Sequence, residues 1–269
     1  MKIAIHSIFI MKENILFLEQ WINYHSLLGF NEFYLYDNSK VQISRKGSHH
    51  YHKCFKEGKI NKYNVNYDAL VELTDNEIKE HVDKICKKYE NVHIIEWSPK
   101  DSEGLILHNQ VDGHNDCLNN YLKKNNIDWC ANIDMDEYIV INNYDNVKDY
   151  ILSLPSNVSS VSMGQIRFRT RFELLNKLVT DITEGEIKQV PRKDGNKALF
   201  NVQNTLRVKI HETKPANGFK VIHPDVNEIC INHYKLNFKS YKHIDNINVN
   251  MKNKINKDSL IPIKGINYE

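Results

Sequence analysis

Two aspartates, Asp134 and Asp136, stand one residue apart where the apolar run 129–133 ends, and Glu137 follows them. Burying a carboxylate costs several kcal/mol unless it is paired, hydrogen-bonded or bound to a metal. Oxygen ligands of this kind suit Mg²⁺ or Mn²⁺, which proteins often share with the phosphates of a substrate. The pattern predicts a metal–diphosphate site in an enzyme that uses a nucleotide-activated substrate.

The spacing of the two aspartates leaves two structures open. Alternate residues of a regular strand point to the same side, so both carboxylates would face one cleft and Met135 would enter the core. The alternative is a polar turn with solvated acids, a common outcome for so short a motif. The surrounding elements must decide between them.

The first forty residues predict a β-α-β unit, the beginning of a parallel sheet. Alternation predicts a strand over residues 3–10, and apolar positions at helical spacing predict a helix from about residue 14 to 28. Gly29 is suited to the residue after that helix. A second strand at 33–36 ends at the polar residues 37–39.

The remaining chain continues this pattern less regularly. Residues 40–80 are polar, and we expect a loop-rich segment with one or two weak helices there. A third strand is expected at 92–97 and a helix at 110–124, directly before the acidic strand. Beyond residue 141 we expect a helix at 146–154 and a mixed or antiparallel half with strands around 158–171, 198–209 and 229–234.

Polar side chains gather where the expected strands end. Asp37 and Asn38 follow the second strand, and Asp134 and Asp136 end the acidic strand. Nucleotides bind outside the carboxyl ends of strands in open α/β sheets. These residues therefore favour a binding cleft over a solvated turn.

Composition narrows the class of protein. The 269 residues suit one domain, and 36 Lys and Arg balance 34 Asp and Glu without a basic block that would favour nucleic acid. Five cysteines without a C-x-x-C pair indicate free thiols, no zinc site and a reducing, cytoplasmic setting. No segment has the apolar length of a transmembrane segment.

Three blocks of sequence occur in order within residues 3–240. The first comprises Lys12-Glu13-Asn14, Trp21-Ile22-Asn23-Tyr24-His25, Gly29-Phe30 and Tyr34-Leu35-Tyr36-Asp37-Asn38-Ser39. The second comprises Gln110, Asn115-Asp116-Cys117-Leu118, Trp129 and Asp134-Met135-Asp136-Glu137-Tyr138, and the third is Ile231-Asn232-His233-Tyr234. Together they resemble glycosyltransferase family 92 and its bacterial family-2-like relatives.

The resemblance implies a GT-A fold, a Rossmann-like α/β domain whose mixed sheet is flanked by helices. One domain would span 1–269, with a nucleotide-sugar half at 1–141, an acceptor-side half at 142–240 and a tail at 241–269. The implied reaction moves a sugar from a nucleoside diphosphate sugar, most simply a UDP-sugar, to a hydroxyl of a glycan or another acceptor. Inversion is the expected stereochemistry, and Mn²⁺ or Mg²⁺ the expected cofactor.

The sequence departs from the family pattern in two places. Glu13-Asn14 inverts the usual order, and Gln20 replaces the glutamate before Trp21. The segment 163–175, which carries Arg167, Arg169 and Arg171, does not match either, so the acceptor does not follow from the resemblance. The three arginines alternate and share a face, which suits an acidic acceptor, a pyrophosphate or plain solvation.

The resemblance also implies roles for the metal and donor residues. Asp136 would bind the metal, Asp134 the metal or the ribose, and His233 the metal or the diphosphate, with His211 as its rival. Nucleotide contacts are expected from three further residues and the helix before the acidic strand: Asp37 and Asn38 toward the base or ribose, Lys12 toward phosphate, and Gln110, Asn115 and Asp116 toward the donor sugar. Asp37 could instead cap a turn, and the helix residues could simply be solvated.

An inverting transferase needs a group that deprotonates the acceptor hydroxyl. Glu212, Asp225 and Glu173 are the candidates, and the sequence does not choose among them.

Two other functions compete with glycosyl transfer. A nucleotidyltransferase also places carboxylates and metal against a nucleotide, but normally with a glycine-rich basic loop, which residues 10–13 do not supply. An inactive transferase fold used as a sugar-binding or scaffold module is the alternative that is not an enzyme. A nucleotidyltransferase should prefer a triphosphate, and a scaffold should respond to neither nucleotide nor metal.

Overall fold

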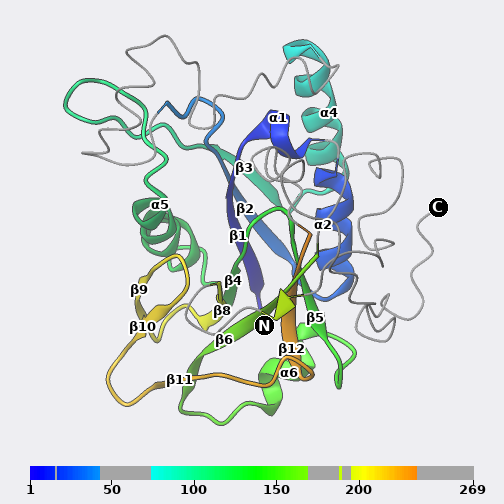
Figure 1. Cartoon of the computed structure of the whole chain (residues 1–269), viewed down its shortest axis with the longest axis vertical. Coiled ribbons are helices and arrows are strands. Elements are labelled where there is room, and N and C mark those ends of the chain that lie inside the picture. Colours follow the sequence, from blue (N-terminus) through cyan, green and yellow to red (C-terminus); the bar gives the residue numbers. More distant parts are fainter. Residues whose placement is uncertain (16, 43–73, 169–187, 190–194, 235–269) are drawn as a thin grey trace.

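The computed structural model describes residues 1–15, 17–42, 74–168, 188–189 and 195–234. The side chains of residues 12–13 and 188–189 fall outside this description. Ten strands of the described chain form one mixed sheet, and its main path runs in the order β3-β2-β1-β4-β8-β6-β12-β5. Figure 1 shows this sheet with helices on both faces. The mixed α/β class predicted from the sequence is confirmed, and the arrangement is consistent with a GT-A-like fold.

The N-terminal half of the sheet is parallel. Strand β1 lies between β2 and β4, and β3 pairs with the outer edge of β2, all in parallel. The elements of this half are β1 (Ile3–Phe9), α1 (Met11–Asn14), α2 (Leu18–Leu27), β2 (Glu32–Asp37), α4 (Asp75–Lys88), β3 (Val92–Glu96), α5 (Gln110–Asp116), the π-helical segment η2 (Cys117–Leu122) and β4 (Trp129–Asn132).

The second half is mixed, as expected. Strand β8 runs antiparallel to β4 and β6, β12 runs parallel to β6, and β5 pairs antiparallel with β12 at the end of the path. The elements of this half are β5 (Glu137–Ile141), α6 (Val147–Ser153), β6 (Val158–Arg167), β7 (Lys188–Gln189), β8 (Lys197–Asn201), β9 (Thr205–Val208), β10 (Thr213–Pro215), β11 (Lys220–Ile222) and β12 (Ile229–His233). The strand expected over 198–209 is two strands, β8 and β9.

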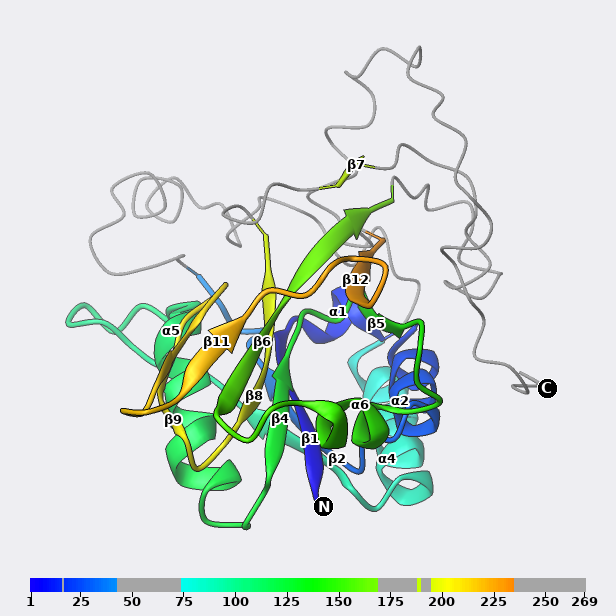
Figure 2. The ribbon, with the colours of Figure 1, turned by 90° about the horizontal axis from the view of Figure 1, so that it is seen from below.

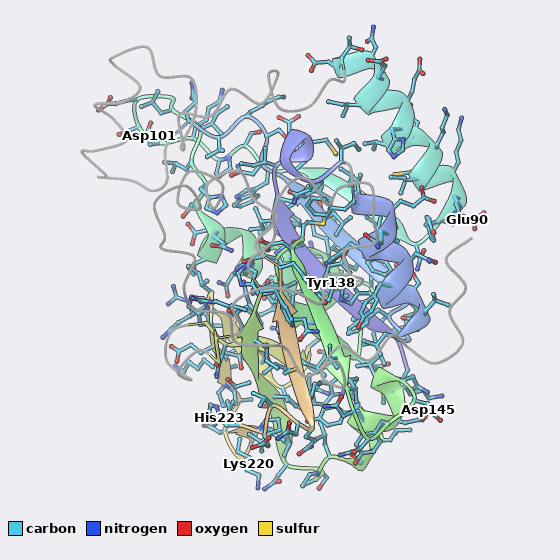
Figure 3. The ribbon with its side chains drawn as sticks, turned by 45° about the vertical axis from the view of Figure 1, so that its right-hand side comes forward. Glu90, Asp101, Tyr138, Asp145, Lys220 and His223 are labelled. Carbon is cyan, nitrogen blue, oxygen red and sulfur yellow. The ribbon has the colours of Figure 1, made fainter. Side chains whose placement is uncertain are left out.

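The helices divide between the two faces of the parallel strands. In Figures 1 and 2, α2 and α4 lie on one side of β1 and β2, and α5 lies on the other. The larger core lies on the α2 side and includes Trp21, Phe33 and Tyr138. Figure 3 shows Tyr138 in the interior of the molecule, and Glu90 and Asp145 at its periphery. Both faces of the sheet are thus covered, which explains why all residues of β1 and β4 are buried.

Helix α2 is shorter than the sequence predicts. It begins at Leu18 rather than near residue 14, because α1 forms a separate turn before it. Its end matches the expectation: Gly29 has φ +104, and the amides of Gly29 and Phe30 donate to the carbonyls of Ser26 and His25. This is a Schellman motif, and its left-handed residue favours glycine.

Helix α4 lies partly outside the segment where weak helices were expected. Its N-terminus carries a capping box: the Thr74 hydroxyl accepts from the Glu77 amide, and the Glu77 carboxylate accepts from the Thr74 amide. Only Ile78 and Ile85 of this helix are fully buried. The Thr-x-x-Glu spacing was the sequence signal for its start, and its first residues, 75–80, lie in the segment where one or two weak helices were expected.

Candidate active site

The two aspartates of the acidic motif lie in a turn, and not in a regular strand. Strand β4 ends at Asn132, β5 begins at Glu137, and the Glu137 amide closes a turn by donating to the Asp134 carbonyl at 3.1 Å. Met135 enters the core, as expected, and is 2 % exposed. We call residues 134–137 the acidic turn. It connects a central strand with the last strand of the path.

The register of the sheet brings the ends of three further strands, β6, β8 and β12, to the acidic turn. Strand β8 begins there at Lys197, one residue before the pair Ala198–Asn132. His233, at the end of β12, pairs with Glu137 on one side and with Arg167, at the end of β6, on the other. The site is therefore built from residues that are far apart in sequence but adjacent across the sheet.

Glu137 is the hub of this site. Its side chain is fully buried, and its carboxylate accepts from the Asp134 amide at 2.8 Å and from the Gln165 amide group at 2.5 Å. Lys197 Nζ and His233 Nδ1 each lie 3.5 Å from a carboxylate oxygen of Glu137. Burial raises the pKa of Glu137 to about 7, with the charges of the neighbouring aspartates adding to the shift and Lys197 opposing it.

Lys197 provides a buried positive charge to the site. Its side chain is 3 % exposed, and Nζ lies 2.9 Å from Asp134 Oδ2. Burial works against the charged form, but the carboxylates of Asp134 and Glu137 outweigh it and raise the pKa of Lys197. The same ion pair outweighs burial at Asp134 and lowers the pKa of that carboxyl. Lys197 is therefore an ammonium ion enclosed by acids.

Asp136 and His233 form the second charged pair. His233 Nε2 lies 3.2 Å from Asp136 Oδ2, and the Tyr234 amide donates to the Asp136 carbonyl at 2.9 Å. The Asp136 side chain is 6 % exposed and that of His233 15 %. Burial lowers the pKa of His233, but the charges of Asp136 and Glu137 outweigh it and raise the pKa above its usual value.

This second pair fits a divalent cation with few protein ligands. Neighbouring ligands of an octahedral cation with metal–oxygen distances near 2.1 Å lie about 3 Å apart, close to the separation of Asp136 Oδ2 and His233 Nε2. Among the residues that the structure describes, no three His, Cys, Asp or Glu side chains are arranged to hold a metal ion. Two protein ligands suit Mg²⁺ or Mn²⁺ bound largely by substrate phosphates and water.

The far wall of the site comes from β6. Gln165 and Arg167 are two residues apart on this strand and share the face of the core residue Met163, and Arg167 Nε donates to Gln165 Oε1 at 3.2 Å. A Cβ added at Gly195 would lie 2.7 Å from Gln165 Oε1 and 2.8 Å from Arg167 Nη2. Glycine at 195 therefore leaves the space that these two side chains occupy. Arg169 and Arg171 fall outside the described residues.

Helix α2 holds β5, and with it the acidic turn, in place. Trp21 Nε1 donates to the Glu137 carbonyl at 2.9 Å, and the Tyr24 hydroxyl donates to the Ile139 carbonyl at 2.8 Å. The Ile139 amide donates to His25 Nε2 at 3.3 Å. Residues 21, 24 and 25 lie on one face of a helix, and they satisfy the edge of β5 that faces away from β12. Trp21 and Tyr24 are both buried, and these hydrogen bonds require the indole nitrogen of one and the hydroxyl of the other.

The end of β2 is organised around turns. The Asp37 carboxylate accepts from the Ser39 amide at 3.0 Å and from the Ser39 hydroxyl, and the Ser39 hydroxyl accepts from the Met11 amide at 2.8 Å. Burial raises the pKa of Asp37, and the bonds from Ser39 oppose that shift. Asp37 thus caps a turn, the alternative that the sequence left open, while its side chain stays partly exposed beside the strand end.

Asn38 is fully buried and forms hydrogen bonds with the segment that follows β3. Its amide group donates to the carbonyls of Trp97 and Leu107 at 2.7 and 3.2 Å, and its oxygen is 2.8 Å from His108 Nδ1. The charge of His108 is among those that lower the pKa of Asp134, so the two residues are near each other. Asn38 thus supports the site from the interior.

The helix before the acidic strand contributes contacts within the protein. Asn115 exchanges hydrogen bonds with the backbone of Val208, donating at 2.8 Å and accepting at 3.0 Å. Asp116 accepts from the Tyr36 hydroxyl at 2.7 Å. Gln110 is the first residue of α5 and is partly exposed. The backbone of Lys12 lies in α1, and its side chain falls outside the described atoms.

The structure does not bring the three candidates for the general base together. Glu212 is exposed and pairs with Lys209 in the turn between β9 and β10. Asp225 accepts from the Asn227 amide before β12 begins, at the opposite end of that strand from His233. Glu173 lies outside the described residues. His211 is exposed and interacts electrostatically with Lys197 and Asp134. Its ring, however, forms a hydrogen bond with the Asn196 carbonyl.

Sequence reasoning missed Lys197 and Gln165 and named Glu137 without a role. A lysine that opens the apolar strand 197–200 was a usable signal, because burying an ammonium requires acidic partners. Gln165 was detectable as the residue that precedes Arg167 on the same face of its strand. Their partners follow only from the register of the sheet.

A comparison with protein-family models gives the class of enzyme to which the chain belongs. The model of glycosyltransferase family 92 matches residues 60–266. The chain belongs to glycosyltransferase family 92. The match confirms the predicted family and enzyme class, and it includes the second and third blocks of the sequence, whereas the first block precedes it. A comparison with curated proteins found no significant match.

None of the helices in the described part of the chain is both long enough and apolar enough to cross a bilayer.

Proposed function

We propose that this glycosyltransferase moves a sugar from a nucleoside diphosphate sugar, most simply a UDP-sugar, to a hydroxyl of a glycan or similar acceptor. The supporting observation is the cluster of Asp134, Asp136, Glu137 and His233 at one end of the sheet. The carboxyl ends of parallel strands β1, β2 and β4 meet there, which is where nucleotides bind in open α/β folds. The partly exposed Asp134, at 38 % of its side chain, is the member most open to a ligand.

The proposed cofactor is Mn²⁺ or Mg²⁺, with Asp136 and His233 as its protein ligands. When bound, such an ion stabilises the negative charge that develops on the diphosphate leaving group. Glu137 holds the Asp134 amide and Gln165, and Trp21 holds the Glu137 carbonyl, so the acidic turn keeps one conformation. Arg167 and Lys197 add positive charge around the same turn, which favours a diphosphate. Asp37, beside the end of β2, is proposed to contact the base or ribose.

We also propose that the two halves of the chain bind different substrates. Residues 1–141 would bind the donor and residues 142–240 the acceptor. Inversion at the anomeric carbon is part of the proposal. The proposed base is Glu212, Asp225 or Glu173, and the contacts of the first two do not single out one of them.

The test is release of nucleoside diphosphate from a panel of UDP-, GDP- and dTDP-sugars by the purified protein, with Mn²⁺, Mg²⁺ or EDTA. We expect metal-dependent release from one donor group, and at least a hundredfold loss in Asp136→Asn. Asp149→Asn, an exposed aspartate in the first turn of α6, is the matched control and should keep full activity. Equal release by Asp136→Asn and wild type would exclude the acidic turn as the reaction site.

A further inference from the structure

We propose that Gln165 is a positioning residue of the metal site, which accepts a hydrogen bond from Nδ1 of His233 and so keeps Nε2 of the same ring directed at the divalent ion. This inference rests on the proposed function, because His233 is one of the two metal ligands proposed there. It gives a role to a buried residue of β6 that need touch neither the metal nor the donor and acts through His233.

The orientation of the Gln165 amide group carries the first step. The oxygen and nitrogen of such a group exchange places when it turns over, so its neighbours decide which atom lies where. Arg167 Nε, which can only donate, lies 3.2 Å from Gln165 Oε1. The Gln165 nitrogen points the other way and donates to Glu137 Oε1 at 2.5 Å. A guanidinium and a carboxyl group thus fix the Gln165 oxygen as the atom near His233.

The surroundings of the His233 ring carry the second step. Two oxygen atoms face Nδ1: Gln165 Oε1 at 3.3 Å and Glu137 Oε1 at 3.5 Å. Oxygen acceptors on this side favour a hydrogen on Nδ1, and a neutral ring with that hydrogen has its lone pair on Nε2. Nε2 lies 3.2 Å from Asp136 Oδ2, the spacing of two neighbouring ligands of one cation.

The sheet holds the glutamine in this position. Strand β12 lies between β5 and β6, where His233 pairs with Glu137 on one side and with Arg167 on the other. Gln165 precedes Arg167 by two residues on the same strand face and is 2 % exposed. A Cβ at residue 195 would lie 2.7 Å from Gln165 Oε1, so Gly195 leaves the space that the amide group fills. Rotating this group away would leave buried polar atoms without partners.

The consequence is an effect on metal affinity from a residue outside the ligand set. An imidazole that binds a metal generally donates its other N–H to an oxygen atom, and losing that partner weakens metal binding by about tenfold to a hundredfold. Gln165 Oε1 is the nearer of the two oxygens that face Nδ1 of His233. The pair of Gln165 and Arg167 therefore belongs to the metal site, although the sequence offered Arg167 only to an acidic ligand or to solvent.

The test measures Mn²⁺ binding to the full chain without a donor, so that it does not depend on turnover. Isothermal titration calorimetry gives the affinity, and pulsed electron paramagnetic resonance of the bound Mn²⁺ detects a coordinated histidine nitrogen. Gln165→Met keeps the length of the side chain but removes its acceptor. It should bind Mn²⁺ about tenfold more weakly or worse, with a reduced histidine signal at equal occupancy. Gln203→Met, at an exposed glutamine between β8 and β9, is the matched control and should match wild type.

A second variant covers the case in which Gln165→Met does not fold. Gln165→Glu keeps an oxygen toward His233, and its other oxygen can share a proton with Glu137. This variant should keep the histidine signal, and His233→Asn, which identifies the source of that signal, should lose it. Loss of the signal in Gln165→Glu, or wild-type affinity and signal in Gln165→Met, would overturn the role of Gln165 and leave the proposed function standing.

The remaining outcomes separate the two proposals. If wild type binds Mn²⁺ without a histidine nitrogen, the role of Gln165 is overturned, whereas metal-dependent transfer through Asp136 stands. If wild type binds no Mn²⁺ either alone or with UDP, the metal dependence in the proposed function fails, and the role of Gln165 fails with it.

Discussion

Removing one hydroxyl from Tyr24 tests how helix α2 holds the strand that begins at the acidic turn. The Tyr24 side chain is almost fully buried, at 3 % exposure, and its hydroxyl donates to the Ile139 carbonyl at 2.8 Å. Strand β5 is the last strand of the sheet path, so this carbonyl points away from β12 and toward the helix. Tyr24→Phe keeps the ring and its packing against Tyr138 and His25, and deletes only the donor.

The expected cost follows from leaving a buried acceptor unsatisfied. Such a loss destabilises a protein by about 1–3 kcal/mol. In a chain of this size that corresponds to a fall in melting temperature of roughly 2–12 °C. Urea denaturation followed by circular dichroism measures the free energy of unfolding, and differential scanning calorimetry measures the melting temperature. Where unfolding is irreversible, the comparison is made at one fixed scan rate.

Tyr121→Phe is the matched control. Tyr121 is a partly buried tyrosine on the opposite face of the sheet, packed against the smaller core cluster. It should change the unfolding free energy by no more than about 0.5 kcal/mol. If Tyr24→Phe also changes the unfolding free energy by no more than about 0.5 kcal/mol, the reasoning that α2 side chains satisfy the backbone groups at the free edge of β5 is refuted.

Three further predictions concern other parts of the site. Gly195→Ala should destabilise the protein by about 1–3 kcal/mol in urea denaturation, because its Cβ would displace Gln165 and Arg167. An unchanged midpoint of urea unfolding would contradict the close packing of these two side chains against Gly195. Burial lowers the pKa of His25 to about 3, so this residue stabilises the fold fully above pH 6.5 and loses that contribution as the pH falls toward 3. The stability difference between wild type and His25→Gln should therefore shrink by about 2 kcal/mol from pH 7 to pH 5, and a difference that stays constant over this range would show that His25 is not buried in its neutral form. Asp37→Ala should weaken nucleotide binding but keep its metal dependence in a titration with UDP, and full retention of affinity would remove Asp37 from the proposed site.

The sequence predicts local features of this fold well. The β-α-β beginning, Gly29 after α2 and the strand before Asp134 follow from alternation, helical spacing and backbone preference over a few residues. The helix η2 continues α5 as expected, although as a π-helical segment. The capping box of Thr74 was equally local, so α4 could have been found from the sequence.

Features that depend on sheet register could not be predicted in the same way. The strand order places β8 beside β4, and β12 between β6 and β5, and only this order brings Lys197 and His233 to the acidic turn. The residue type of His233 suggested a ligand, whereas a lysine carries no such signal until its neighbours are known. The acidic turn itself breaks the period of the strand, because the chain must leave the centre of the sheet for its edge.

Amide side chains show the same limit at single residues. Asn38 and Asn115 were proposed as donor contacts because their types and positions suited a nucleotide site. In the structure both satisfy backbone groups of neighbouring segments, a role that buried asparagines share with ligand-binding ones. A sequence pattern does not distinguish these two roles, since both require the same hydrogen-bonding groups.

The most direct test of the central claim is a thermal-shift experiment with UDP-, GDP-, CMP- and dTDP-sugars, each with Mn²⁺, with Mg²⁺ and with EDTA, on wild type and Asp136→Asn. A metal-dependent donor bound at the acidic turn should raise the melting temperature of wild type with one donor group, most simply the UDP-sugars, and only with metal. The same conditions should leave Asp136→Asn unshifted. An equal shift in both proteins, or a shift that persists in EDTA, would contradict a metal–diphosphate site at the acidic turn.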